Sequence, residues 1–184
     1  MGNIKKVRKK YSKPPHPWRA ARITEENKII SEYGIPRKTE LWKATSKLES
    51  IKNQAKKLTT QSTVQASKEL QALLKKLQSY NLVSEEGSYD SILGITLKDM
   101  LDRRLQTFIY KKGYAKSMRQ ARQMIAHRHI LIGNKLVTSP SYLVKVSQEG
   151  SVSISPKSPF YSQDHPERLK EPSKRKSKVK NEQR

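Results

Sequence analysis

Five side chains between residues 117 and 128 combine the chemistry that recognises a nucleic-acid backbone. Arg119 and Arg122 are three positions apart, so they are neighbours on the surface of a helix. Gln120, Gln123 and His127 form a second row beside them. A guanidinium binds phosphate through a planar fork of donors, and amide or imidazole groups can bond to sugar and base edges. The spacing therefore predicts a helix face that binds nucleic acid.

The alternative for this helix face is a charged surface that contacts only water, which is common on soluble helices. The local charge argues against it. Residues 97–147 hold eleven Lys or Arg side chains and two acidic ones. Such an imbalance favours a polyanionic partner, because it gives a positive field that solubility alone does not require.

Two helix starts and one helix end position this face. Thr96 with Asp99, and Ser117 with Gln120, each have the spacing of a capping box, in which side chains satisfy the free N–H groups of a first turn. Gly113 can adopt the left-handed conformation that ends a helix. The pattern predicts one helix from 96 to 113 and a second one that starts at 117.

The apolar residues of the second helix predict which side faces inward. The apolar stripe consists of Met118, Ala121, Met124 and Ile125. If this stripe faces the core, Arg119 and Arg122 both point outward. After it, Gly133-Asn134 lies between two short apolar runs, as expected for a tight β-hairpin. Residues 142–146 and 152–154 have the composition of further short strands.

The segment RRLQTFIYKKGYAKSMRQARQMIAHRHILIGNKLVTSPSYLV resembles the RNA-binding domain of the universal small-subunit ribosomal protein number four family. The matching pieces follow the order of the family: Arg104-Leu105, Gly113-x-Ala115, Ala121-Arg122-Gln123, His129-Ile130 and Pro140-Ser141-Tyr142. Gln106 replaces an aspartate that is common in bacterial members, as it does in archaeal and eukaryotic ones. Gly133-Asn134 inverts the usual Asn-Gly. The resemblance is to the archaeal and eukaryotic type.

The resemblance implies a structural constituent of the small ribosomal subunit that binds rRNA directly and has no catalytic residues. It also implies binding early in assembly at a multi-helix junction of the rRNA 5′ domain, beside neighbouring ribosomal proteins and near the region where mRNA enters. The expected location is the cytoplasm, in the ribosome, and no homo-oligomer is expected. The predicted rRNA contacts of the domain are Arg103, Arg104, Lys111, Lys112, Lys116, Ser117, Arg119, Gln120, Arg122, Gln123, His127, Arg128, His129, Lys135 and Tyr142.

Composition agrees with an RNA partner. The 184 residues include 39 Lys or Arg and 16 acidic residues, a formal net charge of +23. No stretch approaches the length of a membrane span, and no secretory signal opens the chain. There are no cysteines, which excludes disulfides and cysteine-rich zinc sites. His127 and His129 have no nearby carboxylates, so we expect neither a metal nor a cofactor.

Three other functional classes fit the sequence less well. The same domain resembles appendages of RNA-modifying enzymes and of a tRNA synthetase, but the rest of the chain has no phosphate loop and no nucleophile with a plausible base. A free ribosome-recycling factor or RNA chaperone would hardly need the N-terminal helical region. A helix-turn-helix DNA regulator fits least, because the second helix offers mostly phosphate-type donors.

The predicted fold class is α+β, in four parts. Residues 1–22 form a basic extended arm and residues 23–95 a helical region with a short helix, 24–33, and a hairpin of two longer ones. Residues 96–155 form the RNA-binding domain of two helices, a β-hairpin and short antiparallel strands, and 156–184 a basic, mostly disordered tail. Trp18 could stack on a base or, as we expect for a lone tryptophan, pack against protein. The predicted RNA contacts of the arm, which also fit a nuclear-localisation signal, are Lys5, Lys6, Arg8, Lys9, Lys10 and Lys13.

Overall fold

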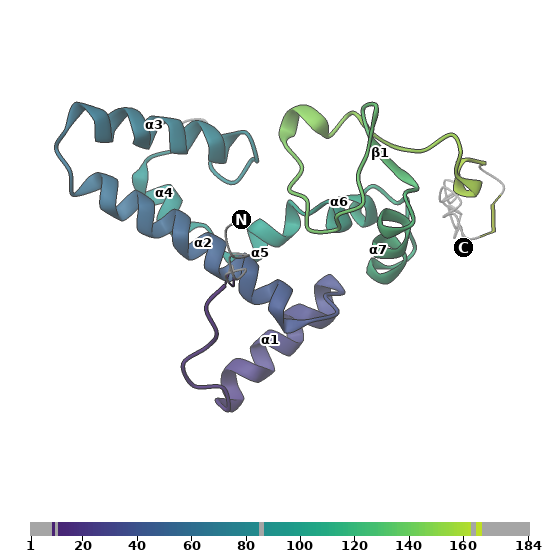
Figure 1. Cartoon of the computed structure of the whole chain (residues 1–184), viewed down its shortest axis with the longest axis horizontal. Helices are drawn as coiled ribbons and strands as arrows, with labels where there is room; N and C mark the ends of the chain where they lie inside the picture. The colour runs from purple at the N-terminus through teal and green to yellow at the C-terminus, as the bar shows by residue number, and fades with distance from the viewer. Residues whose placement is uncertain (1–8, 10, 85–86, 163–164, 167–184) are drawn as a thin grey trace, which may run out of the picture.

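The structure is a computed structural model that describes residues 9, 11–84, 87–162 and 165–166. Two parts lie side by side (Figure 1): a helical part, residues 20–94, and an α/β unit, residues 97–154. The α/β unit ends in a three-stranded antiparallel sheet. The predicted α+β class is confirmed. Within the described residues, no helix is both long and apolar enough to cross a membrane.

The helical part is built on the predicted helical hairpin, which is confirmed. The apolar pattern breaks at residues 59–63, which predicts the start of the second hairpin helix there. Thr63 caps that helix: its side chain accepts a hydrogen bond from the N–H of Ala66 at 3.2 Å. By sequence, Thr39 is the expected cap of the first hairpin helix, but that helix starts one residue earlier, at Lys38, so this prediction is wrong. The four helices are α1 (Ala20–Tyr33), α2 (Lys38–Thr59), α3 (Val64–Gln78) and α4 (Tyr89–Gly94).

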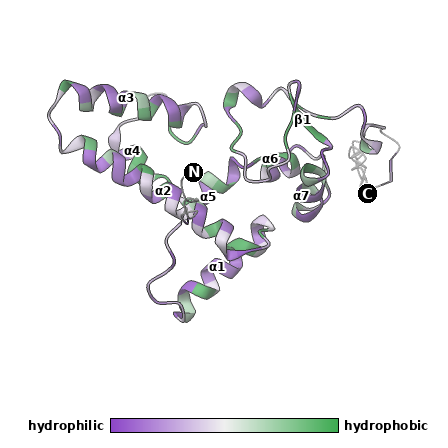
Figure 2. Ribbon diagram, viewed as in Figure 1, coloured by the Kyte–Doolittle hydropathy of each residue, from purple (hydrophilic) through white to green (hydrophobic). Residues whose placement is uncertain are grey.

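The apolar stripes of α2 and α3 face each other and form the core of the helical part. Leu48 and Ala55 of α2 pack with Leu73 and Leu77 of α3. Along both helices, hydrophobic residues alternate with hydrophilic ones (Figure 2). Met100 of the next helix, α5 (Leu97–Asp102), completes this cluster. Helix α5 therefore packs against α2 and links the two parts. The predicted boundary between residues 95 and 96 stays a prediction.

The predicted single helix over 96–113 is two helices in the structure. The capping box of Thr96 and Asp99 is present and starts α5, but α6 (Leu105–Lys111) begins only after a break at Arg104. The backbone of Arg104 is extended there and forms an isolated β-bridge with Leu143. The N–H of Leu105 donates to the carbonyl of Tyr142 at 2.7 Å. The distant segment around Leu143 thus replaces the helical hydrogen bonds that the local pattern favours.

The second predicted helix and the hairpin are confirmed. Gly133 alone of the two turn residues has a positive φ, +58°, which is the arrangement of a type II′ turn with glycine first. Residues 142–146 are not a strand, because only Leu143 pairs, and the prediction for them is wrong. The elements are α7 (Met118–Ala126), β1 (Ile130–Ile132), β2 (Lys135–Leu136), β3 (Val152–Ile154) and two short 3₁₀ turns, Val146–Gln148 and Pro159–Tyr161, with strand order β2-β1-β3.

Gly34 joins α1 to α2 at a point where the α/β unit approaches closely. Its φ is +57°, and a Cβ atom there would lie 2.8 Å from the Cβ of Met118. We expect Gly34→Ala to lower the free energy of unfolding by about 2 to 4 kcal/mol, since it combines left-handed strain with overpacking. Gly113→Ala is the control: φ is +75° but a Cβ would meet nothing within 4 Å, so only about 1 to 2 kcal/mol should be lost. Equal losses in urea unfolding would show that the contact with Met118 is unimportant.

Candidate nucleic-acid interface

Helix α7 carries the residues that were expected to face RNA. The hydroxyl of Ser117 accepts from the N–H of Gln120 at 3.2 Å, so the predicted helix start is confirmed. The Gln120 side-chain oxygen accepts from the N–H of Lys116 instead of closing the box on Ser117. Ser117 and Gln120 thus hold the helix start. The buried side of α7 consists of Ala121, Met124 and Ile125.

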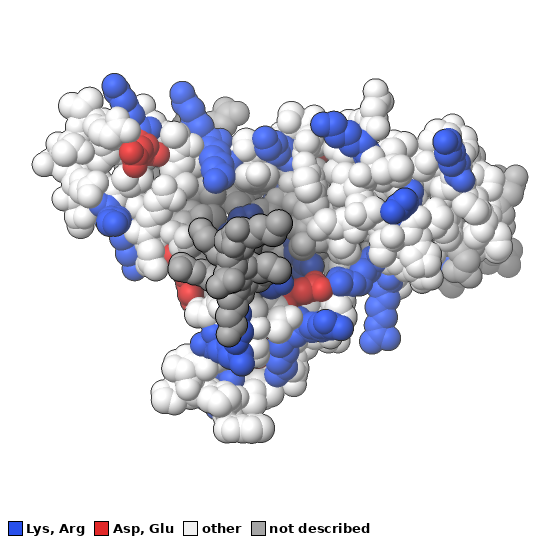
Figure 3. All heavy atoms as spheres, in the orientation of Figure 1, with Lys and Arg blue, Asp and Glu red and all other residues white. Residues whose placement is uncertain are grey.

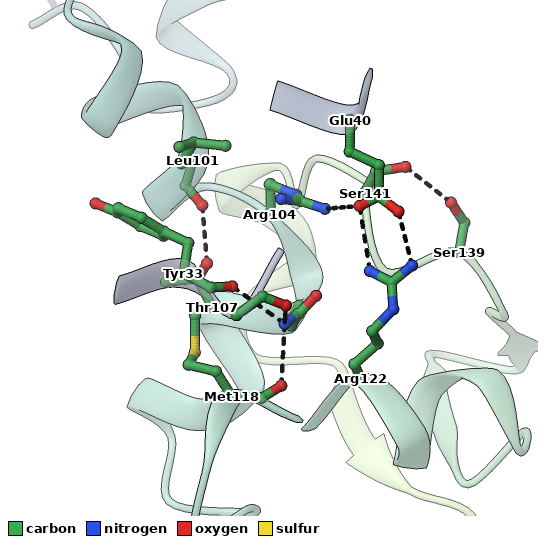
Figure 4. Close-up of polar contacts among 11 residues, drawn as sticks. Tyr33, Glu40, Leu101, Arg104, Thr107, Met118, Arg122, Ser139 and Ser141 are labelled. Carbon is green, nitrogen blue, oxygen red and sulfur yellow. Dashed lines mark hydrogen bonds and ion pairs between the residues drawn. The ribbon is translucent and has the colours of Figure 1, made fainter. Parts of the chain in front are cut away.

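Arg122 does not face outward with Arg119, and that prediction is wrong. Its two terminal nitrogens reach both carboxylate oxygens of Glu40 on α2, at 3.1 and 2.7 Å (Figure 4). Glu40 lies 82 residues earlier in the chain. Arg122 lies at one edge of the helix face that was predicted to bind RNA, and its contact with Glu40 holds α7 against the helical part. Arg119, on the open side, is exposed.

Arg104 shares the same carboxylate. Its side chain is 6% exposed, and its guanidinium donates to Glu40 at 3.1 Å. Burial by itself would raise the pKa of the Glu40 carboxyl, but the hydrogen bonds and charges of Arg122 and Arg104 outweigh burial and hold that pKa below its ordinary value. Burial also lowers the pKa of Arg104, although a guanidinium stays charged. We call these three residues the Glu40 cluster. It joins the two parts of the molecule.

Gln106 contributes a second polar contact between the parts. Its side-chain nitrogen lies 2.9 Å from the carbonyl oxygen of Met118, 3.2 Å from that of Tyr33 and 3.3 Å from that of Gly34. Three carbonyls around one point require a donor, which an amide supplies and a carboxylate does not. This geometry gives a physical reason for glutamine at position 106, where aspartate is common in bacterial members of the family that the sequence resembles.

Several predicted contact residues also make contacts within the protein. Arg103 pairs with Glu149 and donates to the carbonyl of Val144 at 3.1 Å. Lys111 pairs with Asp102 at 2.9 Å, and its side chain stays 57% exposed. The remaining contacts of this kind are Lys112 with the Glu149 carbonyl and the Phe108 ring, Lys116 with the Pro166 carbonyl, and the Tyr142 hydroxyl with Gln148.

His129 is half-buried between α7 and the segment after the sheet. Its Nδ1 lies 2.9 Å from the hydroxyl oxygen of Ser158, and its ring meets Phe160 edge to face. Burial and the neighbouring His127 lower the pKa of His129, which favours the neutral ring. Its contacts are those of a packing residue. In the described part of the chain, no group of three or more His, Cys, Asp or Glu residues could hold a metal ion.

The exposed cations define what remains of the predicted surface. Basic side chains spread over both parts of the molecule on the face in Figure 3, and acidic ones form only a few small patches. Arg119, Arg128 and Lys135 are exposed and make no ion pair with any described residue. Gln123 and His127 are exposed beside them on α7 and its end. We name Arg119, Arg128 and Lys135 the open cations.

A basic hollow of about 350 Å³ lies beside the Glu40 cluster, between α2 and the α/β unit. Lys43 and Lys47 of α2 line it, together with Arg104 and Arg122. Burial and the charge of Lys76 lower the pKa of Lys47. The sequence predicts that the lysines on the outer side of this helix, Lys43 and Lys47 among them, contact either rRNA or solvent, and these two border the hollow. Local patterns do not single out Glu40, because an acidic residue in a basic helix, such as Glu40 or Glu49 of α2, resembles any solvated residue.

The arm is described only in part. Lys9 and Lys13 are exposed. Lys5, Lys6, Arg8 and Lys10 lie outside the described residues, as do residues 163–164 and 167–184 of the predicted tail. Their predicted RNA contacts remain predictions.

Comparison with known proteins identifies the family. Residues 103–149 match the S4 domain. The chain is 44% identical over 169 residues to the small ribosomal subunit protein uS4 of Methanococcus maripaludis, covering 91% of this chain and 95% of that protein. It is 41% identical to uS4 of Thermoplasma acidophilum, covering 98% and 93%, and 43% identical to uS4 of Ignicoccus hospitalis, covering 88% and 97%. With this identity over nearly the whole length of both chains, the protein belongs to the uS4 family of small-subunit ribosomal proteins.

Proposed function

We propose that this protein is a structural, non-enzymatic constituent of the small ribosomal subunit that binds rRNA in the cytoplasm. The observation that carries the proposal is the match to uS4 proteins over 91 to 98% of the chain in the examples from Methanococcus and Thermoplasma. The net charge of +23 fits a partner with many phosphates.

We further propose that the open cations, Arg119, Arg128 and Lys135, contact rRNA phosphates directly. Exposure supports this role, because each of them can approach a phosphate without first breaking an internal ion pair. Lys111, Lys112 and Lys116 are also exposed and join this surface, with Gln123 and His127 reaching sugar or base edges. Arg103, Arg104 and Arg122 act from behind it by fixing the parts that carry the contacts.

The finer role is binding at a multi-helix junction of the rRNA 5′ domain, which would begin the assembly of that domain. The two parts of the chain support it, because a junction needs a protein that fixes several RNA helices at set angles. The Glu40 cluster and Gln106 hold the two parts in one orientation. In the assembled subunit the protein would meet neighbouring ribosomal proteins and lie near the region where mRNA enters.

Filter binding to separate rRNA domains tests this role. Both domains are measured at the same salt concentration. The Kd for the 5′ domain should lie well below about 10⁻⁶ M, the tightest value that non-specific contacts reach, and the Kd for the 3′ domain should not. Equal affinity for the two domains would reject the junction. A free recycling factor or RNA chaperone would also be absent from most purified small subunits, whereas a structural constituent should be present in every one.

A further inference from the structure

Trp18 is the most exposed large apolar side chain in the described part of the chain. It is 89% exposed. Burial of a large apolar side chain normally stabilises a protein, and Trp18 does not contribute in this way. The other tryptophan, Trp42, behaves in the ordinary way: its indole N–H donates to Glu26 at 3.1 Å and its ring lies 6.1 Å from that of Tyr11. Within the described residues, Trp18 does not pack against protein as expected.

The segment that carries Trp18 is fastened at both ends. At its start, the N–H of Ser12 donates to the hydroxyl of Ser46 on α2 at 3.1 Å. At its end, the guanidinium of Arg22 donates to the carbonyl of Pro17 at 2.8 Å and to that of His16 at 3.3 Å. The same guanidinium pairs with Glu26 of α1.

The composition of the segment stiffens it further. Pro14, Pro15 and Pro17 each fix one backbone angle. The tryptophan is therefore held out by a short, stiff loop between two anchors. A ring presented in this way loses little conformational freedom when a partner covers it, which is what makes preorganised contacts strong.

The surroundings of Trp18 indicate which partner covers it. Residues 9–22 contain five Lys or Arg side chains and no acid. Lys13 and Arg19, on either side of the tryptophan, are exposed. An exposed aromatic ring on a basic segment is the arrangement by which proteins hold single-stranded nucleic acid, since bases stack on the ring and phosphates meet the cations. An apolar pocket on a protein would gain nothing from the cations.

We infer that Trp18 stacks on an unpaired base of the small-subunit rRNA, with Lys13 and Arg19 on the phosphates beside that base. This inference rests on the proposed rRNA binding and adds a second contact region, on the N-terminal loop, to the surface of the α/β unit. The stacked base would extend the RNA footprint to the helical part of the chain.

Three substitutions of Trp18 test the inference in filter binding to the rRNA 5′ domain. Trp18→Ala and Trp18→Leu should both weaken binding about 5- to 100-fold, the range found for loss of one base stack. Trp18→Phe keeps an aromatic face and should bind within a few-fold of the wild type. The salt dependence of binding should be unchanged in all three, because stacking involves no phosphate. The melting temperature should stay the same, since the side chain touches little of its own protein.

Fluorescence gives a second readout of the stack. In a Trp42→Phe background Trp18 is the only tryptophan of the chain, and its emission should be quenched when the 5′ domain is added. Unquenched emission at saturating RNA would overturn the inference.

The outcomes separate this inference from the proposed function. A wild-type protein that does not bind the 5′ domain overturns both. A wild type that binds, with Trp18→Ala binding equally well, overturns the base stack alone. A leucine variant that binds as tightly as the wild type overturns it as well, because an aliphatic side chain can fill an apolar pocket but has no face for stacking. Normal RNA affinity with poor incorporation into small subunits would assign Trp18 to a protein neighbour instead.

Discussion

Replacing Glu40 by alanine should lower the free energy of unfolding by about 3 kcal/mol, the lower end of the loss typical for a buried ion pair, because Glu40 itself is 25% exposed. The reason is that Arg104, 6% exposed, and Arg122, 30% exposed, would face each other with no anion between them. Urea unfolding followed by circular dichroism measures the loss.

Glu32→Ala is the matched control for Glu40→Ala. Glu32 also joins the two parts, through Lys98 at 3.3 Å, but both side chains are more than half exposed. Its loss should therefore be about 0.2 to 1 kcal/mol. Equal effects of the two substitutions would show that the Glu40 cluster is no more than a surface ion pair.

The Glu40 cluster also predicts a pH dependence. The folded-state pKa of Glu40 lies below its ordinary value, so its contribution is fully present above the unfolded pKa of about 4.3. It is lost as the pH falls through the lowered pKa. The stability difference between the wild type and Glu40→Ala should accordingly shrink in acid.

Replacing the three open cations together, Arg119→Gln, Arg128→Gln and Lys135→Gln, should weaken binding to the rRNA 5′ domain by about 10³-fold or more. Each charged hydrogen bond to phosphate contributes about 1.5 to 3 kcal/mol, and three of them exceed the 4.1 kcal/mol that corresponds to this factor. The slope of log affinity against log salt, about −4 to −5 for six phosphate contacts, should become shallower by about 2 to 3 units. The melting temperature should hardly change, because the three side chains are exposed.

The control removes the same charge elsewhere. Lys28→Gln, Lys68→Gln and Lys75→Gln change three exposed lysines of α1 and α3 that belong to no predicted RNA surface. This variant should bind at least tenfold better than the first one. Comparable losses in the two variants would mean that total charge, and not the position of the open cations, determines affinity.

The two arginines of α7 have different roles in the structure. Arg119 and Arg122 are neighbours on the helix, yet only Arg119 belongs to the surface. Arg122→Ala should destabilise the protein through Glu40, whereas Arg119→Ala should affect RNA binding alone. A pair substitution would mix both effects, so each arginine requires its own variant.

Local sequence determined the features that depend on nearby residues. The capping side chains of Thr96 and Ser117, the left-handed Gly113, the hairpin at Gly133-Asn134 and the apolar stripe of α7 appear in the structure as predicted. Each is set by a few consecutive residues, because caps, positive φ angles and helical periodicity act within one or two turns. The family resemblance depended on the same short pieces.

Only the tertiary structure decided which polar residues are free to bind RNA. Arg104 and Arg122 have side chains suited to binding phosphate, but both bind Glu40, which lies 64 and 82 positions earlier in the chain. The break between α5 and α6 likewise depends on pairing with Leu143, far along the chain. Helical periodicity fixes the apolar face, whereas a charged residue at its edge can turn toward water or toward another part of the protein. The direction that the side chain takes depends on which charged residues the fold brings within a few ångströms of it, and this cannot be predicted from a local pattern.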